Sequence, residues 1–370
     1  MKILLTGANG FIGKNLTAEL HNQGFTDLLL YDTDTDPALL DTYTASCDFV
    51  FHLAGINRPK QQSEYMQGNF GFTSLLLDSL KKHNNKAPVL ITSSTQAALD
   101  NPYGQSKKAG EELMFGYSAE TETNVYVYRL PNVFGKWCRP NYNSAVATFC
   151  HNIAHGLPIQ VNDPEVPMNL VYIDDVMAGF IGKLKNGKPK PAGEFETIEP
   201  VHSIKLGEIV TLIEQFRDSR STLMVPDMSD AFTRKLYSTY LSYLPGDKFS
   251  YYLKMNTDNR GSFTEFLKSN DRGQVSVNIS RPGITKGNHW HHTKNEKFLV
   301  VSGRGVIRFR KIDGTEIIEY HVSGEKLEVV DIPVGYTHNI ENLGETDMVT
   351  IMWVNEIFNP DKPDTYFLSV

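Results

Sequence analysis

Short apolar runs alternate with amphipathic stretches over the first third of the chain. The apolar runs, which have the character of buried strands, lie at 2–6, 28–32, 49–53, 89–92 and 125–129. Between them, as at 13–23 and 72–82, apolar residues recur with a period of about 3.6, which is typical of helices. Strand–helix alternation at this spacing indicates βαβ units, so we expect an α/β fold with a doubly wound parallel sheet of Rossmann type.

The pattern loosens after residue 130 and changes completely near residue 272. Proline-rich loops separate helical segments up to Pro245-Gly246, a pair that favours a boundary. Beyond it the period becomes two, with strands expected at 274–279, 297–301, 305–310, 316–320, 326–330 and 348–353. Many short strands with regular turns predict an all-β sandwich or small barrel. We therefore predict a cofactor part at about 1–130, a substrate part at about 131–245, a linker at 246–271 and a β domain at 272–370.

Composition and charge exclude several classes of protein. The chain has 370 residues, enough for two cores, and its net charge of −7 argues against non-specific binding to nucleic acid or an anionic membrane. Cys47, Cys138 and Cys150 form no CxxC pair, which favours reduced thiols over disulfides. We see no charged-then-apolar leader and no apolar run near the ~20 residues that span a bilayer. A cytoplasmic protein without a nucleic-acid or membrane partner is expected.

A glycine-rich segment, TGANGFIG at 6–13, follows the first expected strand and opens the first expected helix. Glycines at such a turn let the backbone approach a pyrophosphate, which then lies on the free N–H groups of the helix N-terminus. Asp32 ends the second strand, where a carboxylate accepts hydrogen bonds from a ribose 2′-hydroxyl and favours NAD. Lys14 lies directly behind the last glycine. The residues thus predict a dinucleotide and leave NAD and NADP both open.

Tyr103 and Lys107 lie four residues apart, on one face of a helix if 103–107 is helical. A nearby lysine charge is expected to lower the pKa of the tyrosine and make it a general acid near neutral pH. A hydroxyl from Thr92-Ser93-Ser94-Thr95, at the end of the fourth strand, could orient a substrate carbonyl. The spacing alone fits an ordinary surface helix equally well.

Several motifs in order resemble the extended short-chain dehydrogenases/reductases, a group with sugar-nucleotide epimerases, dehydratases and reductases. The resemblance covers the first 245 residues and rests on the glycine-rich turn, His52-Leu53-Ala54-Gly55, Asn69, the Ser/Tyr/Lys set and the segments 129–135 and 171–176. It implies that Ser94, with Thr95 as second choice, is the catalytic hydroxyl, Tyr103 the acid and Lys107 its activator.

The same resemblance implies a set of cofactor-binding residues. Asn9, Phe11 and Ile12 would line the pyrophosphate, and Leu53 and Ala54 would flank the adenosine side. The expected set is Gly7, Asn9, Gly10, Phe11, Ile12, Gly13, Asp32, Leu53, Ala54, Tyr103 and Lys107. The stretch between Ser94 and Tyr103 is shorter than in the family and lacks its aromatic–glycine pair, which affects substrate contacts made there.

Three histidines and a glutamate in the β region have the spacing of a metal site. His289 and His291 are two residues apart, so on a strand they point to the same face. Glu296 follows after a short turn, and His338 lies in a PxGxxHxxxN segment on a later strand. Such a set suits a divalent first-row metal, zinc above all. The segment resembles a cupin, with Leu327 in place of one motif glycine; His292 is expected to face the opposite side.

The fusion of the two parts is similar to a family of bacterial capsule enzymes. That resemblance implies that the cupin epimerises C3 of a UDP-2-acetamido-2,6-dideoxy-4-hexulose and that the N-terminal domain reduces C4 with NADPH. The product would be UDP-2-acetamido-2,6-dideoxy-L-talose, for capsule N-acetyl-L-fucosamine. Two alternatives stay open: a single-activity NAD(P)-dependent reductase or epimerase with a structural or dimerising cupin, and a non-catalytic cofactor sensor. A UDP-sugar substrate and a homodimer are expected.

Overall fold

The computed structural model describes residues 1–188, 191 and 193–370, and these residues form two compact units. The N-terminal unit comprises residues 1–214 and 235–245. The C-terminal unit comprises residues 215–234 and 246–370.

A five-stranded parallel sheet forms the centre of the N-terminal unit. Its strands are β1 (Ile3–Thr6), β2 (Leu28–Tyr31), β3 (Phe49–His52), β4 (Val89–Ser94) and β5 (Val125–Leu130), in the order β2-β1-β3-β4-β5. Every pairing is parallel, which confirms the predicted doubly wound sheet. Parallel strands end at one edge of the sheet, so the glycine-rich turn after β1 and Ser94 at the end of β4 lie along that edge.

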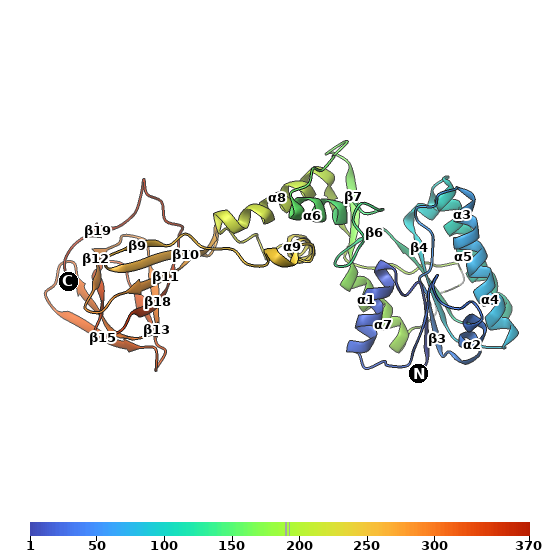
Figure 1. Ribbon diagram of the computed structural model, residues 1–370, viewed down its shortest axis with the longest axis horizontal. Helices are drawn as coiled ribbons and strands as arrows, with labels where there is room; N and C mark the ends of the chain where they lie inside the picture. The colour runs from blue at the N-terminus through green and yellow to red at the C-terminus, as the bar shows by residue number, and fades with distance from the viewer. Residues whose placement is uncertain (189–190, 192) are drawn as a thin grey trace. The chain divides into compact units, whose positions relative to one another are not determined.

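Helices cover both faces of this sheet (Figure 1). One face carries α1 (Phe11–Asn22) and α7 (Ile173–Asn186), and the other carries α2 (Leu39–Ser46), α4 (Phe72–Lys82) and α5 (Pro102–Thr121). In β1, Ile3 and Leu5 pack toward the first pair of helices, whereas Leu4 packs toward the second group. All three side chains are fully buried, each contributing roughly 1.5–3 kcal/mol. Burial on both faces explains why these strands are continuously apolar.

The rest of the N-terminal unit is smaller and mixed. A three-stranded sheet has the order β6-β7-β8, with β6 (Asn132–Phe134), β7 (Pro167–Tyr172) and β8 (His202–Lys205). The accompanying helices are α6 (Ala145–His155), α8 (Leu206–Thr222) and α9 (Ala231–Leu241), the last two shared with the C-terminal unit. A short α3 (Ser63–Tyr65) and a π-helix (Met66–Gly71) lead into α4.

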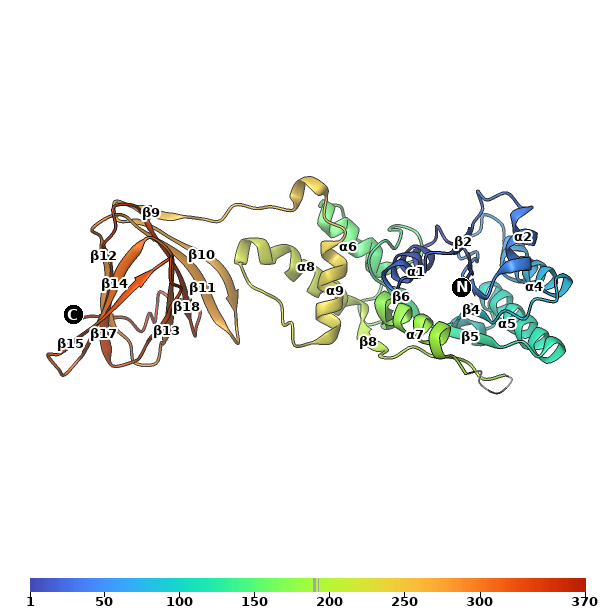
Figure 2. The ribbon, with the colours of Figure 1, turned by 90° about the horizontal axis from the view of Figure 1, so that it is seen from below.

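Two antiparallel sheets face each other in the C-terminal unit (Figure 2). The orders are β16-β13-β18-β11-β10-β9 and β15-β14-β17-β12-β19. The strands from β11 onward are β11 (Gly273–Ser280), β12 (Thr285–Trp290), β13 (Glu296–Ser302), β14 (Arg304–Lys311), β15 (Ile317–Ser323), β16 (Val329–Ile332), β17 (Tyr336–Asn342), β18 (Met348–Val354) and β19 (Tyr366–Phe367). Phe298, Ile307 and Ile340 are buried between the sheets. The predicted all-β, cupin-like fold is confirmed.

The stretch 246–271, expected to be a linker, contains two strands of the larger sheet. β9 (Asn256–Asp258) pairs with β10 (Gly261–Ser269), and β10 pairs with β11. Within this stretch, residues 246–255 contain no strand, and 259–260 and 270–271 are turns. The sequence did not predict β10 because polar residues of this strand are buried and apolar ones are exposed. Ser262 and Thr264 are buried, whereas Phe263 and Phe266 are 38% and 50% exposed.

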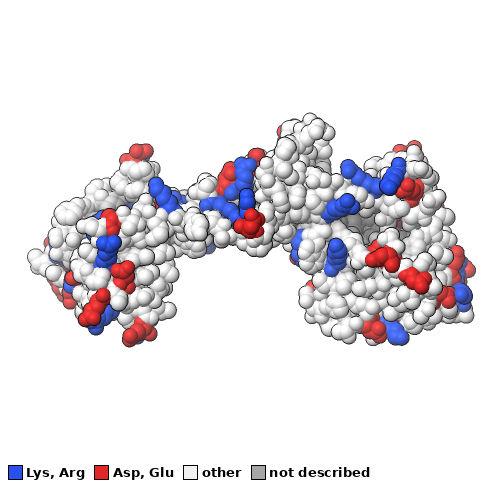
Figure 3. Space-filling model, viewed as in Figure 1, with Lys and Arg blue, Asp and Glu red and all other residues white. Residues whose placement is uncertain are grey.

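The surface carries both signs of charge. On the face shown in Figure 3, acidic and basic side chains lie intermixed over the C-terminal unit. Within the described ranges, no helix combines the length and apolar character that a membrane span requires. Cys47, Cys138 and Cys150 are buried free thiols.

Candidate functional sites

The glycine-rich turn packs tightly against the chain that leaves β3. Gly7 has a φ of +73°, and a Cβ there would lie 2.6 Å from the backbone nitrogen of Ala54. A Cβ on Gly13 would lie 2.1 Å from the carbonyl oxygen of Gly7. Because Gly10, the N-cap of α1, offers no side-chain cap, the first N–H groups of the helix are open to an external acceptor. This arrangement suits the pyrophosphate of a dinucleotide.

Asp32 lies beside this turn. Its Oδ2 accepts a hydrogen bond of 2.7 Å from the backbone N–H of Asn9, and its Oδ1 accepts one of 2.8 Å from that of Thr33. Asp34 lies next to it and accepts from Asn9 Nδ2 at 3.3 Å. Two carboxylates therefore lie at the end of the turn where the ribose of a dinucleotide would lie, and they offer acceptors for ribose hydroxyl groups.

Ser94, Tyr103 and Lys107 come together at the carboxyl edge of the sheet. Helix α5 starts at this point because the side chain of Asn101 accepts the N–H of Gly104 at 2.8 Å and Pro102 occupies the first turn. Ser94 neighbours the Tyr103 phenol and acts on its pKa, and Lys107 Nζ lies 5.9 Å from the centre of the Tyr103 ring. Of the four hydroxyl residues at 92–95, Ser94 is thus the one that acts on the Tyr103 phenol.

The expected lowering of the Tyr103 pKa was wrong. Burial raises the pKa of Tyr103 to about 12, and the neighbouring Ser94 hydroxyl opposes this only partly. Burial also lowers the pKa of Lys107 to about 8. A high pKa keeps the Tyr103 phenol protonated at neutral pH, which is the form that a proton donor needs.

Lys107 is held by buried polar neighbours. Its Nζ donates to the carbonyl oxygen of Thr92 at 3.2 Å, and a Cβ on Gly55 would approach that Nζ to 3.0 Å. Asn69, within the π-helix, accepts from the N–H of Ile56 at 2.8 Å and donates to Ser106 Oγ at 2.9 Å. Asn69 thereby ties the loop after β3 to the first turns of α5, where Tyr103 and Lys107 lie.

His52 is buried and continues this network toward the glycine-rich turn. Its Nδ1 lies 2.8 Å from Thr6 Oγ1, and its Nε2 lies 2.8 Å from Thr73 Oγ1. Since the Thr73 hydroxyl donates to the carbonyl oxygen of Asn69, Nε2 carries the proton and Nδ1 accepts from Thr6. Burial lowers the pKa of His52 to about 3, so the ring is neutral. The pattern His-x-Ala-Gly signalled this residue but not its partners.

Tyr65 was missed at the sequence level. Its ring centre lies 5.6 Å from that of Tyr103, so it packs beside the phenol. Nothing in the local pattern points to Tyr65, because the short α3 that carries it has no clear apolar period.

The C-terminal unit brings together the four residues predicted as metal ligands. One possible ligand atom each from His289, His291, Glu296 and His338 lies within 4.8 Å of the others. Glu296 Oε2 is 3.3 Å from His338 Nε2 and 3.6 Å from His291 Nε2. His292 packs instead against Trp290 and Tyr366, with ring centres 4.5 and 4.9 Å away.

The protonation states and open atoms of this group fit a divalent cation. Burial lowers the pKa of His289 to about 4, which keeps the imidazole neutral. Burial alone would raise the pKa of Glu296, but the neighbouring His291 and His338 outweigh it and lower it to about 2. The Nε2 atoms of His291 and His338 are buried without a hydrogen-bond partner in the described chain. Neutral imidazoles and a carboxylate are the ligating forms.

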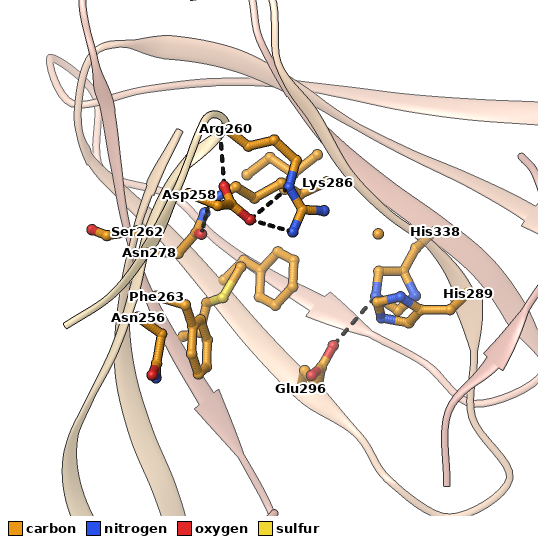
Figure 4. Close-up of a pocket in the computed structure, with 14 residues that line it drawn as sticks. Asn256, Asp258, Arg260, Ser262, Phe263, Asn278, Lys286, His289, Glu296 and His338 are labelled. Atoms are coloured by element: carbon orange, nitrogen blue, oxygen red, sulfur yellow. Dashed lines mark hydrogen bonds and ion pairs between the residues drawn. The ribbon is translucent and has the colours of Figure 1, made fainter. Parts of the chain in front are cut away.

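A cavity of about 240 Å³ opens beside this group (Figure 4). His289, Glu296 and His338 lie at one side, and Asp258 and Arg260 lie at the other. Phe263, Phe298 and Ile340 supply apolar wall. The volume approaches the lower end of ligand pockets, roughly 300 Å³.

The C-terminal segment packs on the loop between the ligands. The carbonyl oxygen of Asp364 lies 2.5 Å from His291 Nδ1; because a carbonyl only accepts, Nδ1 carries the proton and Nε2 faces the group. The Asp364 carboxylate accepts the backbone N–H groups of His292, Thr293 and Lys294 at 3.0, 2.9 and 2.9 Å. A residue far along the chain therefore sets the orientation of His291.

Two family models cover most of the chain. Residues 3–196 match the NAD dependent epimerase/dehydratase family, and residues 256–366 match the polysaccharide biosynthesis C-terminal domain. The first covers the glycine-rich turn and the Ser94/Tyr103/Lys107 group, and the second covers all four histidine and glutamate residues of the metal-like group.

Relatives align over the full length. A UDP-2-acetamido-2,6-beta-L-arabino-hexul-4-ose reductase from Pseudomonas aeruginosa is 46% identical over 100% of this chain and 99% of its own. The crystal structure of the capsular polysaccharide assembling protein CapF from Staphylococcus aureus is 56% identical, with a TM-score of 0.94 and complete coverage of both chains. The chain belongs to the CapF family.

A second CapF structure, with the inhibitor 3-isopropenyl-tropolone, is 52% identical and has a TM-score of 0.90 over both complete chains. Membership of the CapF family accounts for both units at once, because the likeness runs through the parallel sheet and the facing β-sheets. The protein is a nicotinamide-dependent enzyme of sugar-nucleotide metabolism in capsular polysaccharide synthesis.

Proposed function

We propose that this chain is a bifunctional sugar-nucleotide enzyme. Its C-terminal unit epimerises C3 of a UDP-2-acetamido-2,6-dideoxy-4-hexulose, and its N-terminal unit reduces C4 with NADPH to UDP-2-acetamido-2,6-dideoxy-L-talose. The observation that carries the reductase is the grouping of Ser94 and Tyr103 beside buried Lys107, at the sheet edge that also carries the glycine-rich turn. The full-length relative with a 4-keto sugar reductase name supports the substrate class.

The reductase step follows from these three residues. The bound nicotinamide supplies the hydride that reduces C4. Ser94 and Tyr103 orient the ketone through hydrogen bonds to O4, and Tyr103 delivers its proton to O4 as negative charge develops there. Lys107, buried behind the phenol, stabilises the phenolate that remains.

The epimerase step needs an acidified C–H bond. The hydrogen on C3 is acidic because it is α to the C4 ketone, and its loss gives an enolate; reprotonation from the other face inverts C3. His289, His291, Glu296 and His338 would hold a divalent cation, zinc above all, and such a cation stabilises developing negative charge as a Lewis acid. Inhibition of a CapF protein by a tropolone, which has two adjacent oxygen atoms suited to metal chelation, supports a metal here.

One alternative has a specific observation in its favour. A cation with four protein ligands resembles a structural zinc site more than a catalytic one, which keeps an open position. The C-terminal unit would then serve stability or dimerisation, and the chain would have a single NAD(P)-dependent activity. A cofactor sensor is disfavoured because it has no use for the Ser94/Tyr103/Lys107 group.

Hydrogen exchange at C3 separates these functions. The UDP-linked 4-keto sugar is incubated in D2O without NADPH, with wild type, Tyr103→Phe and His338→Ala protein, and deuterium at C3 is followed by NMR. We expect exchange in the first two and none in the third. Absence of exchange in the wild type, with reduction intact, would leave the C-terminal unit a structural role.

We further propose that the protein is a cytoplasmic homodimer. Reductases and cupins of the two families that the units resemble commonly form dimers, and three buried free thiols fit the reducing cytoplasm. Sedimentation at micromolar concentration measures the assembly directly, and a monomer would contradict it.

Cofactor choice gives a prediction at Asp32. In Asp32→Asn the acceptor for the Asn9 N–H remains, but the charge that repels a 2′-phosphate is gone. We expect the ratio of kcat/KM for NADPH over NADH to rise about tenfold, the effect of one unit charge at a partly exposed site. Asp27→Asn, at the other end of β2, is the matched control and should leave the ratio unchanged. A fall in the ratio would mean that the ribose 2′-position of the cofactor does not lie beside Asp32.

Metal affinity gives a prediction at Asp364. In Asp364→Ala the three N–H groups at 292–294 lose their common acceptor, and the loop that follows His291 loosens. We expect metal affinity to fall about 10–100-fold, as for other residues that orient ligands. Competition with a chelator of known affinity measures it. Asp361→Ala, an exposed residue of the same segment, should bind metal as the wild type does; equal affinities in all three would refute the role of Asp364.

A further inference from the structure

A β-bulge turns Lys286 toward the metal-ligand group. Strict alternation would place residues 286 and 289 on opposite faces of β12. The pairing of β12 with β17 shifts between Gly287 and His289, and the intervening Asn288 has a φ of +59°. The extra residue restores the phase, so Lys286 and His289 both line the cavity.

Lys286 has a fixed position and one free donor. Its Nζ donates to Asn278 Oδ1 and to the carbonyl oxygen of Ile279, both at 2.8 Å. An ammonium group has three donors, so one remains for a ligand. Neither of the two acceptors is charged, and burial lowers the pKa of Lys286, so an anion in the cavity would stabilise its protonated form.

Arg260 adds a second cation at the same end of the cavity. Asp258 holds its guanidinium with two hydrogen bonds to Oδ2, from Nε at 3.0 Å and Nη2 at 2.6 Å. This fixes the fork and leaves Nη1 for a ligand. The charges of Lys286, Arg260 and Asp258 sum to one net positive charge at this end of the cavity. Ser262, which also lines the cavity, has a buried hydroxyl without a hydrogen-bond partner in the described chain.

We propose that Lys286 and Arg260 form the anion-binding end of this cavity and take the diphosphate of the nucleotide sugar. The inference rests on the proposed function, since it takes the nucleotide sugar as the ligand of the C-terminal unit. The sugar ring then lies between the two cations and His289, Glu296 and His338 (Figure 4). A diphosphate suits this end because lysine binds phosphate as a point charge and arginine through paired N–H groups.

The test compares two ligands in the full-length protein. C3 exchange in D2O without NADPH is measured for the UDP-linked 4-keto sugar and for the same 4-keto sugar without UDP. In Lys286→Met and Arg260→Met we expect KM for the UDP-linked sugar to rise about tenfold or more, the loss of one charge-assisted hydrogen bond, with kcat nearly unchanged. KM for the free sugar stays at the wild-type value. Lys286→Arg restores most of the lost affinity.

Lys297→Met is the matched control, because Lys297 lies on β13 outside the cavity lining and pairs with Asp331. Metal content is measured in every variant and should equal that of the wild type. Equal losses for both sugars, or no loss for either, would overturn the proposal.

A second measurement stands apart from epimerisation. Calorimetric titration with UDP should find two sites per chain in the wild type and one in Lys286→Met. If the wild type exchanges no C3 hydrogen but shows this change in stoichiometry, the epimerase function fails and the binding site stands. If exchange occurs and the stoichiometry does not change, the binding site fails and the epimerase stands.

Discussion

Replacement of Tyr103 by phenylalanine is expected to lower kcat for C4 reduction by about a hundredfold to ten-thousandfold, the usual contribution of a general acid. The change removes only the hydroxyl beside Ser94, while the ring keeps its packing against Tyr65. Single-turnover reduction of the 4-keto sugar, followed by loss of NADPH absorbance, measures the effect. Exchange of the C3 hydrogen should continue in this variant, because the C-terminal unit is proposed to catalyse it.

The control for Tyr103 is another tyrosine of α5. Tyr117 is 3% exposed and donates to the carbonyl oxygen of Asn85, away from Ser94 and Lys107. Tyr117→Phe should cost about 1 kcal/mol of stability and leave the rate of reduction nearly unchanged. If Tyr103→Phe kept a tenth of the wild-type rate or more, Tyr103 would not be the proton donor.

The pKa of Tyr103 adds a pH dependence to this result. Because burial raises that pKa to about 12, the phenol stays protonated throughout the neutral range. Loss of the Tyr103 proton therefore should not limit kcat between about pH 6 and 9. A decline of kcat at the upper end of this range would report the charge of Lys107 instead, whose pKa burial lowers to about 8.

Loss of the metal group is the second large effect. The double variant His289→Ala, His338→Ala should bind no metal after purification, because two of four ligands are gone. We expect the melting transition of the C-terminal unit to fall by at least about 2 °C, since even 1 kcal/mol shifts Tm by roughly 2–4 °C in a domain of about 150 residues. Elemental analysis and calorimetry measure the two effects, and NADPH binding should remain.

His292→Ala is the control for that experiment. His292 follows His291 directly in the sequence, yet it packs against Trp290 and Tyr366. The variant should keep a full complement of metal. Stoichiometric metal in the double variant would mean that His289 and His338 are not ligands.

The local sequence predicted the features that depend on the conformation of one segment, such as strands, helix starts and the spacing of side chains along an element. Apolar runs such as 2–6 and 49–53 became parallel strands because burial on both faces selects continuous apolar residues. Asn101 and Pro102 begin α5 through their own capping chemistry, so the four-residue spacing of Tyr103 and Lys107 became one helical turn. The two-residue spacing of His289 and His291 put both rings in the group, as strand alternation requires.

Other features escaped prediction because their causes lie far away in the chain. β10 buries Ser262 and exposes Phe263, so its pattern gave no strand signal until its pairing with β11 was seen. The pKa of Tyr103 rises instead of falling because the packed fold removes water from the phenol, an effect that the spacing to Lys107 does not reveal.

By itself, the sequence determined the fold class, the glycine-rich turn, the Ser94/Tyr103/Lys107 group and the histidine and glutamate cluster, since each shows in local periodicity or in short ordered motifs. The tertiary structure alone decided three further points. It placed Ser94 against Tyr103, turned Lys286 into the cavity through a bulge set by the partner strand, and oriented His291 through the carbonyl of Asp364. Each is a contact between distant segments, and the packing that creates such contacts has no counterpart in local sequence periodicity.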